Sequence, residues 1–221
     1  MNLLIASFFV HFFIGQEISH ARELPQHEIT ADSSDFALRD SLLDMDYESF
    51  KSHLSNGADP TAWLDDSQFG WVMCAATESG REEYLKLLIE SGNDVNFRQT
   101  DISSAISLPL TCAVRFGNLN ALKLLVDAGA QPERTPCDAC VNRKPMSVMS
   151  EAILVRKYEL ADWLFNKGNY TDAQLRTDAS ILQRQKVNES SAQNIHRLTL
   201  AEKLRESGYE VRLWSRGEES D

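Results

Sequence analysis

The chain has 221 residues, of which 25% are charged and 43% hydrophobic, a composition typical of a globular protein with one core. Its formal net charge is −11 at pH 7. This acidity argues against a nucleic-acid ligand, because phosphate backbones select patches of Lys and Arg. A basic protein partner is compatible with it, and so is the simpler interpretation that net acidity only keeps the chain soluble.

Residues 1–21 have the pattern of a secretory signal peptide. The apolar run over residues 3–15 is shorter than the roughly 20 residues of a membrane span. Small residues in the Ser-His-Ala triplet at 19–21 occupy the positions that a signal peptidase reads. We therefore expect cleavage after Ala21 and a periplasmic location. Because no Lys or Arg precedes the apolar run, an uncleaved amphipathic anchor is the alternative.

A repeated pattern follows, with copies at residues 46–60, 80–96 and 117–132 and a weaker fourth copy at 158–168. Each copy places apolar side chains at helical spacing, which predicts an amphipathic helix. A glycine follows each helix, at Gly57, Gly92, Gly129 and Gly168, with separations of 35, 37 and 39 residues. A glycine at this place fits the left-handed cap that ends a helix.

A shorter apolar helix is predicted ahead of the long one, at residues 71–76 and 108–114 in the second and third copies. Pro109 occupies a first-turn position, where a missing N–H group costs nothing. Gly80 and Gly117 then mark the turn between the short helix and the long one. Every copy is thus predicted to be a helix–turn–helix unit.

These copies resemble ankyrin repeats. Residues 108–114 are similar to the family signature Thr-Pro-Leu-His-x-Ala, with Leu108 in place of Thr and Thr111 in place of His. Residues 117–129 resemble the second helix of the family almost position by position. The resemblance covers about residues 35–170 and implies an all-α solenoid of four to five helix–turn–helix repeats.

Two further helices are predicted at residues 172–187 and 198–207, closed by Gly208, as a degenerate C-terminal capping repeat. Such a repeat needs a polar outer face. The candidates for that face are Arg184, Gln185, Lys186, Glu202, Lys203, Arg205 and Glu206. The repeat domain is expected over residues 34–210 as a monomer, between a flexible segment at 22–33 and a tail at 211–221.

The four cysteines fall into two pairs. Cys74 and Cys112 lie in the short helices of neighbouring copies and are interpreted as small buried side chains, with a bridge between them as the alternative. Cys137 and Cys140 lie in the long loop between the third and fourth copies, where we predict a structural disulfide. A redox dithiol, free thiols and a zinc site are alternatives, although no further zinc ligand or thioredoxin-like unit lies nearby. No metal or other cofactor is expected.

The sequence holds no phosphate-binding glycine loop, metal-ligand helix or nucleophile elbow, so we do not expect an enzyme. The resemblance implies a binding module that uses its loop tips and the exposed face of its short helices. Carried over to this chain, it predicts partner-binding residues at Asp65, Asp66, Phe69, Trp71, Arg98, Gln99, Asp101, Arg134, Asp138, Arg143 and Lys144. Asp65 and Asp66 are alternatively a solvated loop tip, and Trp71 alternatively packs between repeats.

Exported ankyrin-repeat proteins of this size resemble immunity proteins that neutralise a secreted toxin. They are also similar to periplasmic factors that support a detoxifying enzyme. Our hypothesis is a non-catalytic protein-binding module, most specifically an immunity protein. The alternatives are the periplasmic supporting factor, a thiol-redox protein using Cys137 and Cys140, and a structural protein anchored by its N-terminal segment.

Overall fold

The computed structural model describes residues 32–62, 71–77, 81–97, 108–134, 146–185 and 192–213. Within these ranges the chain forms ten α-helices and no β-strand. The bounds are Ser33–Leu43 for α1, Tyr47–Ser55 for α2, Val72–Ala75 for α3, Glu82–Glu90 for α4, Pro109–Phe116 for α5, Leu119–Asp127 for α6, Val148–Leu154 for α7, Tyr158–Phe165 for α8, Asp172–Arg184 for α9 and Ala192–Glu206 for α10.

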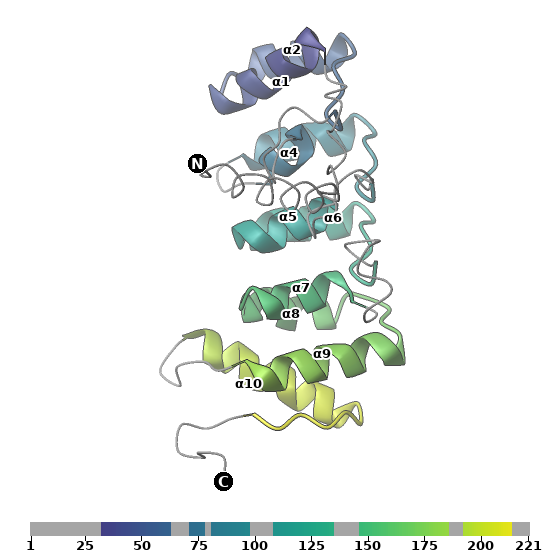
Figure 1. Cartoon of the computed structure of the whole chain (residues 1–221). Helices are drawn as coiled ribbons and strands as arrows, with labels where there is room; N and C mark the ends of the chain where they lie inside the picture. The colour runs from purple at the N-terminus through teal and green to yellow at the C-terminus, as the bar shows by residue number, and fades with distance from the viewer. Residues whose placement is uncertain are drawn as a thin grey trace, which may run out of the picture.

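The helices stack in chain order, from α1 and α2 at one end to α9 and α10 at the other (Figure 1). We call α1, α3, α5, α7 and α9 the inner helices and their successors the outer helices. Each inner helix contacts the next inner helix along the stack, and outer helices contact one another at α2–α4, α4–α6 and α8–α10. The predicted all-α solenoid is confirmed.

The core runs through the stack between the inner and outer helices. Leu85 and Leu88 of α4 are fully buried, as are Leu122 and Leu125 of α6. These are positions whose helical spacing predicted amphipathic helices, so the periodicity correctly identified the buried faces.

The glycines that follow the long helices are not all used in the same way. Gly57, Gly92 and Gly129 are left-handed as predicted, with φ between 83° and 96°. Gly168 is not left-handed. A Cβ atom there would lie 2.4 Å from Cζ of Tyr170, whose hydroxyl donates to the carbonyl of Leu164 at 3.0 Å. Glycine is therefore needed at 168 for space rather than for backbone conformation.

A left-handed residue recurs two positions before α2, α6 and α8. It is Gly117 before α6, with φ 73°, but Met45 before α2 and Arg156 before α8, with φ 59° and 60°. Side chains with a Cβ atom are strained in this region by about 1–2 kcal/mol. The first and fourth repeats therefore contain a strained turn where the third has glycine.

Met45→Gly is expected to raise the free energy of unfolding by about 1 kcal/mol through relief of this strain. The Met45 side chain is 66% exposed, so its removal costs little packing. Urea denaturation followed by circular dichroism measures the change. Met45→Ala keeps the Cβ atom and should leave stability nearly unchanged, so an equal gain in both variants would contradict the explanation.

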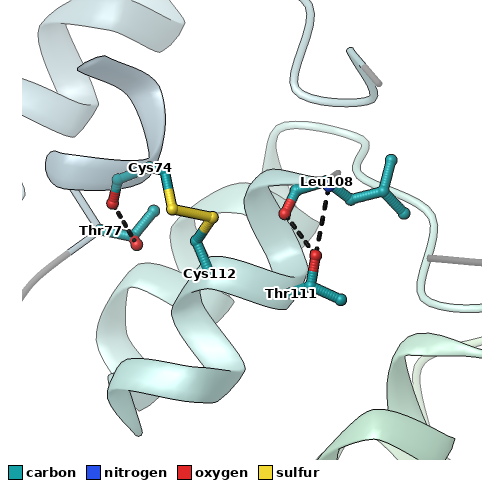
Figure 2. Close-up of a disulfide and its surroundings, with 5 residues drawn as sticks. All are labelled: Cys74, Thr77, Leu108, Thr111 and Cys112. Carbon is teal, nitrogen blue, oxygen red and sulfur yellow. Dashed lines mark hydrogen bonds between the residues drawn. A yellow bond between two sulfur atoms is a disulfide. The ribbon is translucent and has the colours of Figure 1, made fainter. Parts of the chain in front are cut away.

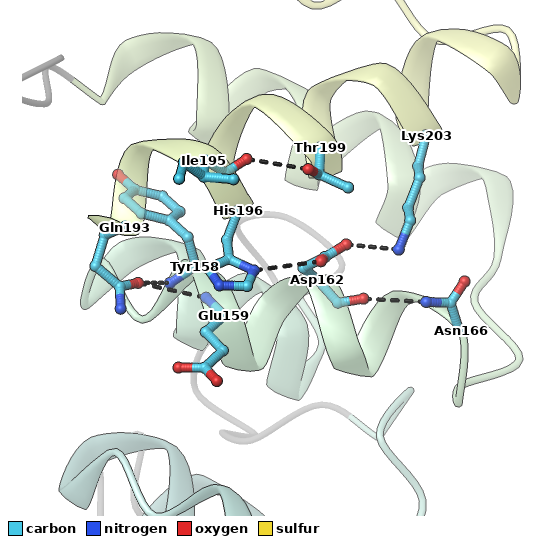
Figure 3. Close-up of polar contacts among 9 residues, drawn as sticks. All are labelled: Tyr158, Glu159, Asp162, Asn166, Gln193, Ile195, His196, Thr199 and Lys203. Carbon is cyan, nitrogen blue, oxygen red and sulfur yellow. Dashed lines mark hydrogen bonds and ion pairs between the residues drawn. The ribbon is translucent and has the colours of Figure 1, made fainter. Parts of the chain in front are cut away.

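The C-terminal repeat begins its second helix earlier than predicted, at Ala192 rather than 198. The first turns of α10 lack apolar periodicity and are held by polar contacts instead. The Gln193 side-chain oxygen accepts from the backbone N–H groups of Tyr158 and Glu159, at 2.9 and 3.3 Å (Figure 3). Pattern analysis misses this segment because its stabilising contact lies about 35 residues away in the sequence.

The outer surface of α10 differs in part from the predicted polar face. Glu202 and Arg205 are exposed as predicted. Lys203 instead turns toward α8, where its Nζ lies 2.6 Å from Oδ1 of Asp162 (Figure 3). The exposed positions also include Ile195 and Leu198, at 67% and 49%. The cap is therefore less polar than its composition indicated.

Candidate functional site

A disulfide between Cys74 and Cys112 joins the inner helices α3 and α5 (Figure 2). The two Cα atoms are 5.4 Å apart, within the range that a disulfide requires, and both side chains are fully buried. The preferred prediction, two separate buried thiols, is wrong, and the bridge held as its alternative is present. The sequence could not distinguish the two possibilities because it does not give the distance between the Cα atoms of the two cysteines.

Short local hydrogen bonds hold the helices at both ends of this bridge. The Thr77 hydroxyl donates to the carbonyl of Cys74 at 2.7 Å. The Thr111 hydroxyl donates to the carbonyl of Leu108 at 2.6 Å and accepts from its N–H at 3.2 Å, which closes the first turn of α5 (Figure 2). Thr111, which stands where the family has His, thus forms hydrogen bonds with the backbone groups of Leu108 at the start of α5.

An ion pair joins the next two inner helices, α5 and α7. Nη2 of Arg115 lies 2.7 Å from Oε1 of Glu151, whose side chain is 4% exposed. Burial raises the pKa of Glu151, and the positive charge of Arg115 opposes that rise. Removing either partner would leave the other charge poorly compensated, so this contact ties the third repeat to the fourth.

A buried carboxyl joins α7 to α9. Asp178 of α9 is fully buried, and its Oδ1 accepts a hydrogen bond from the hydroxyl of Ser150 in α7. Its other oxygen, Oδ2, is buried and has no hydrogen-bond partner among the residues that the structure describes. Burial raises the pKa of Asp178 to about 7, and the Ser150 hydrogen bond only partly offsets this effect. The junctions α3–α5, α5–α7 and α7–α9 therefore carry a covalent bond, an ion pair and a hydrogen bond in turn.

The inner helices expose less surface than the ankyrin resemblance implies. Every side chain from Pro109 to Val114 in α5 and from Val148 to Ile153 in α7 is buried. Exposure begins only at the last turns, with Arg115 and Leu154. The expectation of an accessible inner-helix face is therefore wrong for these stretches, and the loop tips are the remaining candidate surface.

The segments that follow the outer helices lie along one edge of the stack (Figure 1). They are tied to each other through Asn96, whose side chain donates to the carbonyl of Gly129 and accepts from the N–H of Gln131, both at 2.9 Å. Nη1 of Arg134 donates to the backbone carbonyl of Asn96 at 2.8 Å. These contacts hold the bases of successive loops at a fixed spacing.

Two of the predicted partner-binding residues can be placed. Trp71 is fully buried, with its ring centroid 5.9 Å from that of Phe97, so it is a core residue, as the packing alternative implied. Arg134 supports the loop of the preceding repeat. Outside the described residues lie Asp65, Asp66, Phe69, Arg98, Gln99, Asp101, Asp138, Arg143 and Lys144, together with Cys137 and Cys140.

Of the residues that join the inner helices, Cys74 and Cys112 were singled out in the sequence, whereas the ion pair of α5–α7 and the hydrogen bond of α7–α9 were not predicted. Glu151 is the fourth residue of α7 and Cys112 the fourth of α5. An acid at a repeat position that is otherwise small is a signal that comparison of the copies could have found. Among the described residues, no cluster of three His, Cys, Asp or Glu could hold a metal ion. None of the described helices is long and apolar enough to cross a membrane.

Comparison with known proteins agrees with this fold. Residues 72–126, from α3 to α6, match a family model described as ankyrin repeats in many copies. A stretch of 94 residues, 42% of the chain, is 35% identical to Protein VAPYRIN-LIKE of Medicago truncatula. The match covers 18% of that protein, so the chain spans only a small part of this curated relative. The chain contains ankyrin repeats, and these repeats indicate a protein-interaction module.

Proposed function

We propose that this ankyrin-repeat protein is exported to the periplasm and binds a protein partner there without catalysing a reaction. More specifically, we propose that it is an immunity protein that inhibits a secreted toxin. The observation that carries the export proposal is the buried Cys74–Cys112 bridge between two repeats. Structural disulfides form and persist in oxidising compartments such as the periplasm and are rare in the cytosol.

Net charge and preorganised loops support a protein partner at the loop edge, the edge of the stack formed by the segments that follow the outer helices. The net charge of −11 favours a basic partner through electrostatic steering. The hydrogen bonds around Asn96 hold neighbouring loop bases in place before binding, which lowers the ordering cost of an interface. Arg98 and Arg143 lead the predicted contacts, because Arg is enriched among interface residues with large energetic effects.

Expression of the full gene in a bacterium tests export. We expect the intact mass of the purified protein to match a chain that begins at Arg22. Thiol labelling under denaturing conditions should find Cys74 and Cys112 unreactive until a reductant is added. A chain that begins at Met1 and has both thiols free would refute the export proposal.

Partner capture tests the immunity proposal. We expect a C-terminally tagged chain to recover one dominant partner, encoded beside this gene, whose activity the protein inhibits. Arg98→Ala with Arg143→Ala should weaken that binding roughly tenfold or more. The exposed Lys123→Ala, on the outer helix α6, is the matched control. Trp71→Ala is unsuitable because Trp71 is a core residue. Absence of any partner that binds more tightly than about 1 μM would refute the proposal.

A further inference from the structure

A groove of about 320 Å³ lies between the outer helices α2 and α4. This volume is at the lower end of the range for ligand pockets, about 300–1,000 Å³. Its lining residues come from the C-terminal halves of both helices and the segments that follow them: Lys51, Leu54, Ser55, Ala58, Pro60, Leu87, Ser91 and Asn93.

The groove exists because the two helices pack closely at one end only. At their N-terminal ends, the ring of Tyr84 meets those of Tyr47 and Phe50 edge to face, with centroids 5.5 and 4.9 Å apart. Toward the C-terminal ends the facing side chains include the short Ser55 and Ser91. Small side chains at these positions leave the space between the helices unfilled.

The polar groups of the groove are mostly occupied by their own helices. The hydroxyls of Ser55 and Ser91 donate to the carbonyls of Lys51 and Leu87, each at 2.8 Å. The Asn93 amide donates to the carbonyl of Leu88 at 2.8 Å. These donors are therefore engaged and are not directed at a ligand.

Lys51 is the exception. Its side chain is exposed, and within the described part of the chain its ammonium group makes no ion pair. It stands at the edge of a trough whose apolar surface comes from Leu54, Pro60 and Leu87. The chemistry that complements this arrangement is an aliphatic group next to a single negative charge.

We propose that the α2–α4 groove is a second docking site, which takes a segment of a partner protein with an aliphatic side chain beside a carboxylate. The aliphatic side chain lies between Leu54 and Leu87, and the carboxylate pairs with Lys51. This site does not depend on export or on the predicted contacts of Arg98 and Arg143.

Blocked dipeptides test the proposal with the full chain. Acetyl-Leu-Glu-amide and acetyl-Glu-Leu-amide are titrated against isotopically labelled protein, with the corresponding Gln peptides as uncharged controls. We expect the NMR signals of Leu54, Leu87 and Lys51 to shift, and the better Glu peptide to bind about two- to fivefold more tightly than its Gln counterpart, as an exposed ion pair allows. Lys51→Met should abolish that preference, whereas Lys86→Met, at an exposed lysine of α4 outside the lining, should preserve it.

Ser91→Phe fills the groove at an exposed position without altering the core, and should abolish the shifts. Equal binding of the Glu and Gln peptides, a preference that survives Lys51→Met, or shifts confined to other residues would each overturn the proposal. Binding of hexanoate but of neither Glu peptide would also overturn it, in favour of a free carboxylate ligand.

Discussion

Replacement of Cys74 and Cys112 together by alanine is expected to lower the free energy of unfolding by about 4 kcal/mol. The bridge links residues 38 positions apart, and closing a loop of that length removes much of the conformational entropy of the unfolded chain. Denaturant titration of the oxidised protein and the double variant measures the loss. Because both sulfurs are buried, reduction of the folded protein should be slow until denaturant opens the α3–α5 junction.

The second cysteine pair provides the control. Cys137→Ser with Cys140→Ser would remove the predicted bridge that closes a loop of only a few residues, and the same entropy argument gives it about half the effect, about 2 kcal/mol. A Cys74/Cys112 double variant as stable as the wild type, with no dependence of the wild type on reductant, would show that the α3–α5 bridge does not form.

The wild-type protein is expected to lose stability as pH rises from about 4 to about 7, through Asp178. Burial raises its pKa to about 7 in the folded protein, from 3.8 for an ordinary Asp. Between these values the folded state holds a proton that the unfolded state has lost, so a higher pH favours unfolding. At 1.36 kcal/mol per pH unit, the loss over this window is on the order of 4 kcal/mol.

Asp178→Asn removes this titration while its side-chain oxygen can still accept from Ser150. We expect the variant to show a flatter profile of unfolding free energy against pH, and to be more stable than the wild type at pH 8. Asp127→Asn, at an exposed position in α6, is the matched control and should keep the wild-type slope. Since burial also raises the pKa of Glu151, some slope of the same sign should survive in both variants. Parallel profiles for the wild type and Asp178→Asn would contradict the assignment.

The helices that sequence predicted well are those determined by local pattern. The spacing of Leu85 and Leu88 identified α4 and its buried face, and Pro109 marked the first residue of α5. Gly92 and Gly129 ended their helices as expected, because the left-handed cap is a property of the residue itself. The predictions failed where contacts between residues distant in sequence determine the structure. An example is the start of α10, which Gln193 holds against α8.

The contacts between inner helices needed the relative placement of neighbouring repeats, which a single sequence does not contain. Cys74 is the third residue of α3 and Cys112 the fourth of α5, so the bridge joins positions that are not equivalent in the repeat. Simple alignment of the copies would not pair them. The contact of Arg134 with the backbone of Asn96 was missed for the same reason, because it also crosses between repeats, and the partner-binding role of Arg134 stays a prediction.

The three unlike bonds between inner helices have a consequence for how the stack comes apart. In a solenoid each repeat contacts only its neighbours, so unfolding can begin at an end and advance one repeat at a time. The α7–α9 junction is destabilised when Asp178 ionises as pH rises past about 7, the ion pair at α5–α7 weakens at high salt, and the disulfide at α3–α5 responds only to reductant. Unfolding that starts at the C-terminal end must therefore break a hydrogen bond, then an ion pair and then a disulfide. Each of these junctions is weakened by a different solvent condition.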